Sequence, residues 1–183
     1  MKSKLFFLSF ALWALTFFFR LFIHVEPISN DSIRGKSNAV VEKIIKSADN
    51  NDKTATFELI LTNNLKGCLI NVFGGVLLSV ATVGNLLVNG FAAADVFRNA
   101  YDSGFPLTSI LKTTLPHSFE LLGFWLSGMI GFMITWQLIR FMKGKKAFSS
   151  HVIKQMCILL SIMAILIIGA AYVEAFISIN MMK

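Results

Sequence analysis

Residues 115–140 read L-P-H-S-F-E-L-L-G-F-W-L-S-G-M-I-G-F-M-I-T-W-Q-L-I-R, and this stretch decides the fold. Pro116 fits the first position of a helix, because the N–H that proline lacks would have no intrahelical acceptor there. We therefore expect a helix to begin at this residue. His117 and Glu120 fall on one face of its first turn, where the positive end of the helix dipole favours a carboxylate. The apolar run that follows is long enough to cross a bilayer.

Small residues recur every four positions along this run, at Gly123, Ser127 and Gly131. A stripe of this kind lets a second helix approach closely within a membrane. We expect the stripe to form the packed side of the helix, and the side that is rich in Phe, Leu and Trp to face lipid.

The composition is typical of an integral membrane protein. Hydrophobic residues make up 55% of the 183 residues and charged residues 15%, and the mean hydropathy is +0.68. The net charge of +7 does not indicate nucleic-acid binding, because the basic residues cluster beside an apolar run. Positive-inside orientation accounts for that cluster and predicts a cytoplasmic loop. Its members are Arg140, Lys143, Lys145 and Lys146, followed by Lys154.

The sequence carries no motif that favours an enzyme. H-x-x-E at His117 and Glu120 lacks the second histidine of the zinc-protease motif H-E-x-x-H. The chain has no G-x-S-x-G, Walker A or G-x-G-x-x-G. Its two cysteines, Cys68 and Cys157, begin apolar segments and are expected to be small buried residues. We expect no catalytic activity, no metal and no cofactor.

The first 57 residues divide into an apolar and a polar part. Residues 1–24 place Lys2 and Lys4 before an apolar stretch that lacks the small residues of a cleavage site, which predicts a retained transmembrane anchor with a cytoplasmic N-terminus. Residues 25–57 are polar with nearly balanced charge, which predicts the one extracytoplasmic segment. Within it, residues 37–48 have helical apolar spacing. This short amphipathic helix could lie on the membrane surface, on a partner or over the chain's own spans.

Residues 57–66 predict an amphipathic lead-in helix that ends at Asn63 and Asn64. Residues 67–91 contain no charge and predict a membrane span. One face of this span is polar or small, and that face should meet another helix because an amide facing lipid would lack a hydrogen-bond partner. Its members are Asn71, Gly75, Ser79, Thr82, Asn85 and Asn89.

Topology requires one more crossing than hydropathy indicates. If residues 92–114 were a loop, the basic loop after residue 140 would face outward, against the positive-inside rule. A short crossing or broken helix between about residues 85 and 111 restores the orientation. We therefore predict an all-α, polytopic membrane helical bundle of about five transmembrane helices, with its C-terminus outside the cell.

The last span, about residues 152–179, contains Glu174 near its outer end. That is the depth at which Pro116, His117 and Glu120 begin their helix. Ionisable residues inside spans are costly and mark either function or pairing. Two roles stay open for these residues: a structural one at a buried helix end, and contact with an ion, a proton or a partner.

Five short motifs, in this order, resemble the family named after the stage II sporulation protein M. They are Asn63–Asn64, Gly74–Gly75, Asn89–Gly90, L-P-H-x-x-E-L at residues 115–121 and A-A-x-x-E-A-F-I at residues 170–177. The resemblance runs from about Phe57 to the end and indicates a membrane domain at residues 58–183. This domain follows the anchor (1–24) and the extracytoplasmic segment (25–57) that the residues themselves predict. It implies a multi-pass membrane protein without a known catalytic activity.

The resemblance also implies functions to choose between. Some family members are encoded in circular-bacteriocin gene clusters together with ABC-type exporters. The sporulation member works in engulfment with two peptidoglycan-degrading partners. We expect a component of a bacterial inner-membrane complex in the lipid bilayer, accessory to peptide or bacteriocin maturation, export or immunity. One alternative is a scaffold for peptidoglycan hydrolases. The other is a small transporter or channel lined by His117, Glu120 and Glu174. A homo-oligomer is compatible with each.

Overall fold

The computed structural model describes residues 2–23, 42–44, 46–104, 106–108, 110 and 117–178. Every regular element in this part of the chain is a helix, so the predicted all-α class is confirmed. The elements are α1 (Lys2–Phe22), α3 (Lys53–Gly74), α4 (Val80–Asp102), α6 (His117–Met142), α7 (Ser150–Val173) and the short π-helix η1 (Glu174–Ser178). Pro116, where the sequence predicts the start of α6, lies just outside the described residues.

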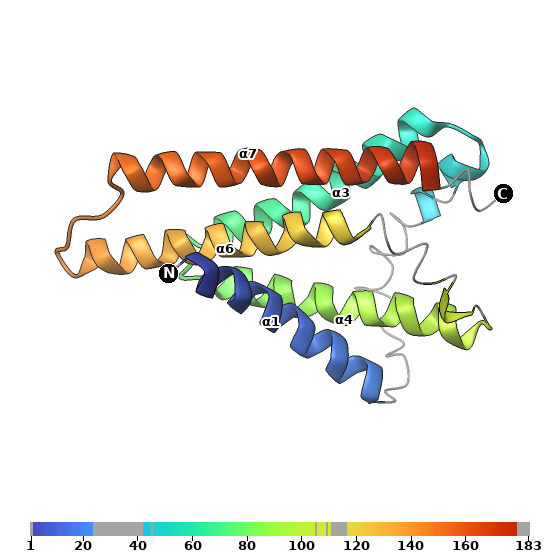
Figure 1. Ribbon diagram of the computed structural model, residues 1–183, viewed down its shortest axis with the longest axis horizontal. Helices are drawn as coiled ribbons and strands as arrows, with labels where there is room; N and C mark the ends of the chain where they lie inside the picture. Colours follow the sequence, from blue (N-terminus) through green and yellow to red (C-terminus); the bar gives the residue numbers. More distant parts are fainter. Residues whose placement is uncertain are drawn as a thin grey trace.

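The five long helices run alternately in opposite directions (Figure 1). The N-terminus, the α3–α4 turn and the α6–α7 loop lie at one end of the bundle, and the C-terminus lies at the other. Within the described residues, four helical segments are long and apolar enough to cross a membrane: Ser3–Phe22, Val80–Asp102, Ser118–Met142 and Ser150–Ile177. Helix α3 has 22 residues but is less apolar, since Lys53, Glu58 and Lys66 interrupt it.

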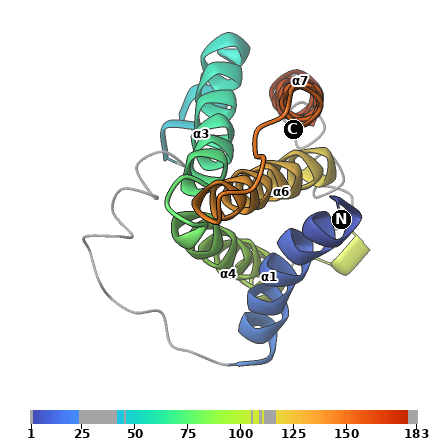
Figure 2. The same ribbon diagram turned by 90° about the vertical axis from the view of Figure 1, so that its left-hand side faces the viewer.

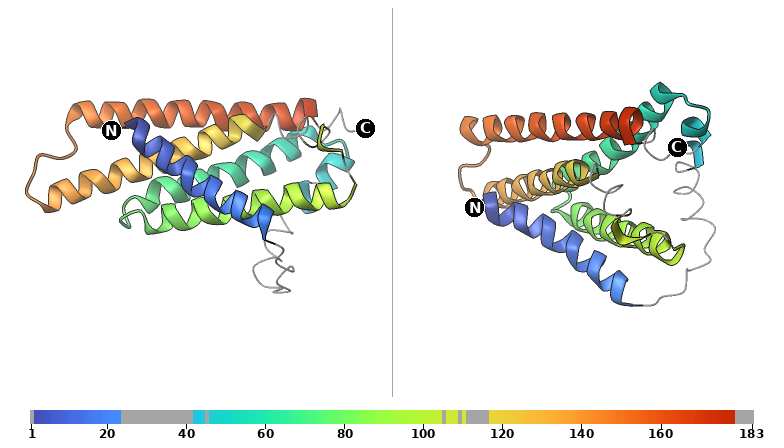
Figure 3. Two further views of the ribbon diagram at one scale, coloured as in Figure 1. Left: turned by 60° about the horizontal axis from the view of Figure 1, so that its bottom comes forward. Right: turned by 45° about the vertical axis from the view of Figure 1, so that its right-hand side comes forward.

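Helix α6 occupies the centre of the bundle when it is viewed from the N-terminal end (Figure 2). It packs against α3, α7 and α1 and also contacts α4. Helices α1 and α4 pack along each other, and both diverge from α7 toward the end where the C-terminus lies (Figure 3). Helices α1 and α4 approach α6 closely at Gly128. A Cβ on this glycine would lie 2.8 Å from Ser9 Oγ of α1 and 3.2 Å from Leu86 of α4.

The predicted span Gly67–Phe91 is wrong, because the chain reverses inside it. Helix α3 ends at Gly74, and α4 begins at Val80 and runs back beside it. Leu78 and Ser79 have φ values of 50° and 63°, so the turn uses left-handed backbone at two residues that are not glycine. The region in which the sequence predicts a short extra crossing thus forms α4, which is a full helix of 23 residues and not a short segment.

Two smaller expectations about α3 and its surroundings also change. The lead-in helix does not end at Asn63 and Asn64, because α3 continues through both residues to Gly74. Part of the predicted amphipathic helix lies outside the described residues, but residues 42–44 and 46–49 are helical. Ile44 packs against Ile60, Ala171 and Ala175. The described part of this helix therefore covers the chain's own helices α3, α7 and η1.

Candidate functional site

A polar cluster lies inside the bundle, where α3, α4 and α6 meet. We call it the amide cluster; its members are Asn71 of α3, Thr82, Asn85 and Asn89 of α4, and Ser127 of α6. The Asn71 amide donates to Ser127 Oγ (2.9 Å), and the Asn85 amide donates to Asn71 Oδ1 (2.8 Å) and to the Gly67 carbonyl (2.9 Å). Asn71, Thr82 and Ser127 have no exposed surface. The cluster joins three helices through side-chain and backbone bonds.

The backbones of α3 and α6 touch directly beside this cluster. A Cβ on Gly75 would collide with the Gly131 carbonyl, and a Cβ on Gly131 would collide with the Asn71 carbonyl. The Thr135 hydroxyl donates to the Gly75 carbonyl (2.8 Å) and lies 2.5 Å from Ser79 Oγ. Of the predicted packing residues, Gly75, Ser127 and Gly131 thus lie at the contact between α3 and α6. Gly123 lies against Ile167 of α7.

The predicted ionisable residues lie at the end of the bundle that carries the C-terminus (Figure 1). Glu120 is in the first turn of α6, and Glu174 is the first residue of η1 after α7. Both are partly buried, and each has an interaction partner. His117 is the first residue of α6, and its side chain lies outside the described part. Helix packing therefore brings the start of α6 and the end of α7 to one layer.

The two predicted asparagines of α3 have different surroundings. Asn63 is exposed, whereas Asn64 is partly buried. Its Nδ2 is fully covered and has no hydrogen-bond partner within the described residues. Helices α3 and α6 run in the same direction, and Asn71 contacts Ser127 at a separation of 56 residues. The same separation in sequence places Asn64 level with Glu120. This pair lies nearer to the C-terminal end of the bundle than Asn71 and Ser127 do. Asn89, in contrast, belongs to the amide cluster and donates to Asn85 Oδ1 (3.0 Å).

An ion pair that the sequence analysis missed ties α1 to α4. Arg20 Nε lies 2.7 Å from Asp95 Oδ1, and the Arg20 guanidinium also donates to the Ile23 carbonyl (3.0 Å). Its carbon Cζ lies 5.1 Å from the centre of the Phe91 ring. Arg20 is buried, whereas Asp95 is partly exposed. The sequence feature that could have indicated this pair is an arginine at the end of one apolar run, Arg20, and an aspartate after another, Asp95, 75 residues later.

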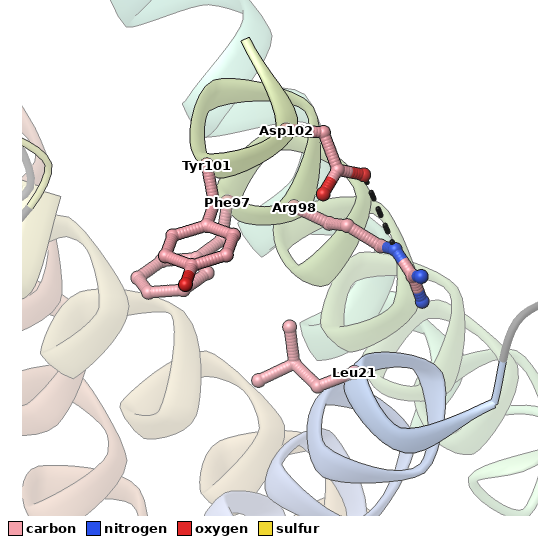
Figure 4. A pocket seen from close by; sticks show the side chains of 5 residues that line it. All are labelled: Leu21, Phe97, Arg98, Tyr101 and Asp102. Atoms are coloured by element: carbon pink, nitrogen blue, oxygen red, sulfur yellow. Dashed lines mark ion pairs between the residues drawn. The ribbon is translucent and has the colours of Figure 1, made fainter. Parts of the chain in front are cut away.

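A shallow surface pocket of about 200 Å³ opens near the ends of α1 and α4. Figure 4 shows Phe97 and Tyr101 lying together on one side of it and Arg98 and Asp102 on the other, above Leu21. Arg98 Nε lies 3.4 Å from Asp102 Oδ2, one helical turn away. The pocket belongs to the surface of the bundle end and does not lead into the amide cluster.

The described residues hold no group of three or more metal-ligating side chains. Cys68 is fully buried on α3, as expected. Cys157 is exposed on α7, so the expectation that both cysteines are buried was wrong for this residue. It lies on a helix whose outward side carries exposed Ile153, Ile158 and Ile162, which is the pattern of a lipid-facing surface.

Comparison with known proteins identifies the chain's relatives. The family model for stage II sporulation protein M matches residues 4–179, which includes α1 and extends well before Phe57. Uncharacterized protein MJ0793 of Methanocaldococcus jannaschii is 32% identical over 125 residues, which cover 67% of this chain and 70% of that protein. No solved structure matches the chain at a significant level. The helices, the motifs and the family model agree, and the chain belongs to the stage II sporulation protein M family.

Proposed function

We propose that this chain is a non-catalytic subunit of a membrane complex, accessory to the maturation, export or immunity of a peptide such as a bacteriocin, beside an ABC transporter. One observation supports the view that the chain is an accessory subunit and not itself a transporter. The polar side chains of the amide cluster bond to one another and to backbone carbonyls. Groups that are satisfied in this way stabilise helix contacts and are poorly suited to line a pathway for a solute.

The end that carries the C-terminus is the best place for a partner to contact the bundle. Helices α1 and α4 diverge there from α7 (Figure 3), and Glu120 and Glu174 lie in that layer. Asn64, whose amide nitrogen is covered and has no hydrogen-bond partner among the described residues, is level with Glu120. Carboxylates and amides near a membrane boundary form charge-assisted hydrogen bonds with a neighbouring protein. We infer that a membrane partner binds at this layer.

Affinity purification from gently solubilised native membranes tests this function. Wild-type protein should retain a second membrane subunit in stoichiometric amount, and Glu120→Gln should lose most of it while its own level in the membrane stays normal. Glu58→Gln is a matched control, because Glu58 is an exposed carboxylate of α3 near the same end. Wild-type protein that purifies alone, or only with copies of itself, would contradict the accessory function.

The distribution of charge supports an N-terminus in the cytoplasm and a C-terminus outside. On the N-terminal side, the described ends of α1, α6 and α7 carry basic residues, the turn between α3 and α4 carries no charge, and none of these ends carries an acidic residue. The acidic residues of the described chain all lie toward the other end: Glu42, Asp49, Asp52, Glu58, Asp95, Asp102, Glu120 and Glu174.

Cysteine labelling with a membrane-impermeant reagent tests this orientation. In a Cys157→Ser background, a cysteine at position 145 should react only after the cells are permeabilised, and one at position 49 should react in intact cells. The reverse pattern would show that the bundle is inserted the other way round.

A further inference from the structure

The loop between α6 and α7 presents three exposed lysines from a defined backbone. Lys143, Lys145 and Lys146 are all exposed. The Phe148 N–H donates to the side-chain oxygen of Gln137 (3.3 Å), and Gln137 is only 3% exposed. The Lys145 N–H donates to the Arg140 carbonyl (2.9 Å), which closes the end of α6. The loop is therefore tied to the helix before it.

Large apolar side chains flank these lysines. Phe141 and Met142 are the last two residues of α6 and are each 69% exposed, and Lys143 follows directly. Phe148, at the other end of the loop, is 37% exposed. Apolar side chains next to lysines match the boundary of a bilayer, because the rings enter the acyl layer while the ammonium groups reach the phosphates. This order of groups is the one expected for lysines at head-group depth.

The positive charge of this end has no acidic counterpart within the described chain. Lys4 of α1 and Lys154 of α7 lie at the same end, and the described residues there include no Asp or Glu. The two ion pairs found, Arg20–Asp95 and Arg98–Asp102, lie toward the opposite end. An anion that neutralises this end must therefore come from outside the described residues.

We propose that the α6–α7 loop binds the phosphate groups of anionic phospholipids, such as phosphatidylglycerol, in the leaflet that it faces. Each lysine close to an anionic bilayer surface raises the affinity roughly fivefold, so three lysines contribute a factor on the order of 100. The interaction weakens with salt, because head-group charges are screened within about 10 Å at 0.1 M ionic strength. It requires no partner protein and is independent of the proposed accessory function.

Lipid binding to the purified full chain tests the proposal. The protein in a neutral detergent is titrated with dioctanoyl phosphatidylglycerol or with dioctanoyl phosphatidylcholine, and bound lipid is counted by native mass spectrometry. We expect phosphatidylglycerol to bind on the order of 100-fold more tightly than phosphatidylcholine. The triple variant Lys143→Gln, Lys145→Gln, Lys146→Gln should lose on the order of 100-fold in phosphatidylglycerol affinity, and its phosphatidylcholine binding should not change.

A second triple variant controls for net charge. Lys43→Gln, Lys46→Gln, Lys53→Gln removes the same charge from the opposite end of the bundle and should retain phosphatidylglycerol affinity within about twofold, as expected when no lipid phosphate is bound there. Circular dichroism establishes that both variants keep the wild-type helix content. Equal affinity of the wild type for the two lipids, or equal losses in the two triple variants, would overturn the proposal. Because no partner is present, either result leaves the accessory function to its own test.

Discussion

The two sides of α6 contact their neighbours in different ways. On the side of α3 and α4, Gly131 contacts the backbone carbonyl of Asn71. The fully buried side chains of Ser127 and Asn71 are hydrogen-bonded to each other. On the side of α1 and α7, the contacts are with side chains: Met129 and Met133 pack with Met156, Trp125 packs with aromatic rings of α1, and Gly123 and Gly128 lie against the side chains of Ile167 and Ser9. Both sides are well packed, but only the first combines close backbone approach with polar bonds.

This difference indicates which contacts fix the relative positions of the helices. In a bilayer, apolar helix contacts replace equally apolar lipid contacts, so methionine and aromatic packing restricts the relative position of two helices only weakly. Glycine contacts and buried amides allow one position, because any shift separates the bonded groups or causes a collision. The contact of α6 with α3 and α4 should therefore control the fold, and the contact with α1 and α7 should tolerate change.

The largest effect is expected from Gly131→Ala. The new Cβ would collide with the Asn71 carbonyl, which is backbone and cannot rotate away, so α3 and α6 must separate. We expect a loss of about 3 kcal/mol in the free energy of unfolding, at the upper end of overpacking effects. Unfolding of the detergent-solubilised protein by SDS, followed by circular dichroism, measures it.

Gly84→Ala is the matched control for this variant. A Cβ on Gly84 would meet nothing within 4 Å, and alanine is the better helix former by about 1 kcal/mol. Its stability should be equal to the wild type or higher. If both glycine variants lost stability equally, close approach at Gly131 would not be the controlling feature.

An intermediate effect is expected from Asn71→Leu. Leucine has the same branching and the same number of side-chain heavy atoms as asparagine, but it removes the bonds that Asn71 makes with Asn85 and Ser127, which should cost about 1–2 kcal/mol in the same unfolding assay. Asn63→Leu places the same change on an exposed position of the same helix and should stay within about 0.5 kcal/mol. An Asn71 variant as stable as the Asn63 variant would show that the amide cluster contributes little.

The smallest effect is expected from Trp125→Phe, on the tolerant side of α6. The indole N–H of Trp125 is buried without a hydrogen-bond partner in the described part of the chain, so its removal relieves an unsatisfied donor. Phenylalanine retains ring contacts with Phe10 and Trp13, whose centres lie 4.9 and 5.5 Å away. Stability should change by no more than about 0.5 kcal/mol. A loss above that of Asn71→Leu would reverse the ranking of the two sides.

Much of the helical framework follows from local sequence. The apolar run after Glu120 predicts α6 almost to its last residue, since the structure ends it at Met142 and the predicted run ended at Arg140. The apolar stretches at the N-terminus and after Ser149 likewise predict α1 and α7. These assignments succeed because an uninterrupted apolar run in a bilayer can satisfy its backbone only as a helix.

The reversal between α3 and α4 did not follow from local sequence. Residues 67–91 are uninterrupted by charge, and a helical glycine pair is common in membrane spans, so Gly74 and Gly75 gave no unambiguous turn signal. The left-handed backbone of Leu78 and Ser79 costs conformational energy. Bonds of Ser79 and Gly75 to Thr135, and the contact of Gly75 with Gly131, offset this cost.

The candidate site was likewise predicted only in part from the sequence. The sequence predicted that Asn71, Asn85 and Asn89 would face another helix, since amides facing lipid are unsatisfied, but it placed them on one continuous span. It did not predict that Asn71 and Asn85 would bond to each other across a turn, or that Arg20 would pair with Asp95 across 75 residues. Such pairs depend on distances in space that no local pattern encodes.

The helical class, the apolar character that suits a membrane and the family of this protein all follow from the sequence, because these properties depend on composition, periodicity and short motifs. The tertiary structure alone decided where the third helix begins and which polar groups meet inside the bundle. The physical reason is that helix formation is satisfied within one segment, whereas a backbone contact such as Gly75 with Gly131 forms only when two segments meet.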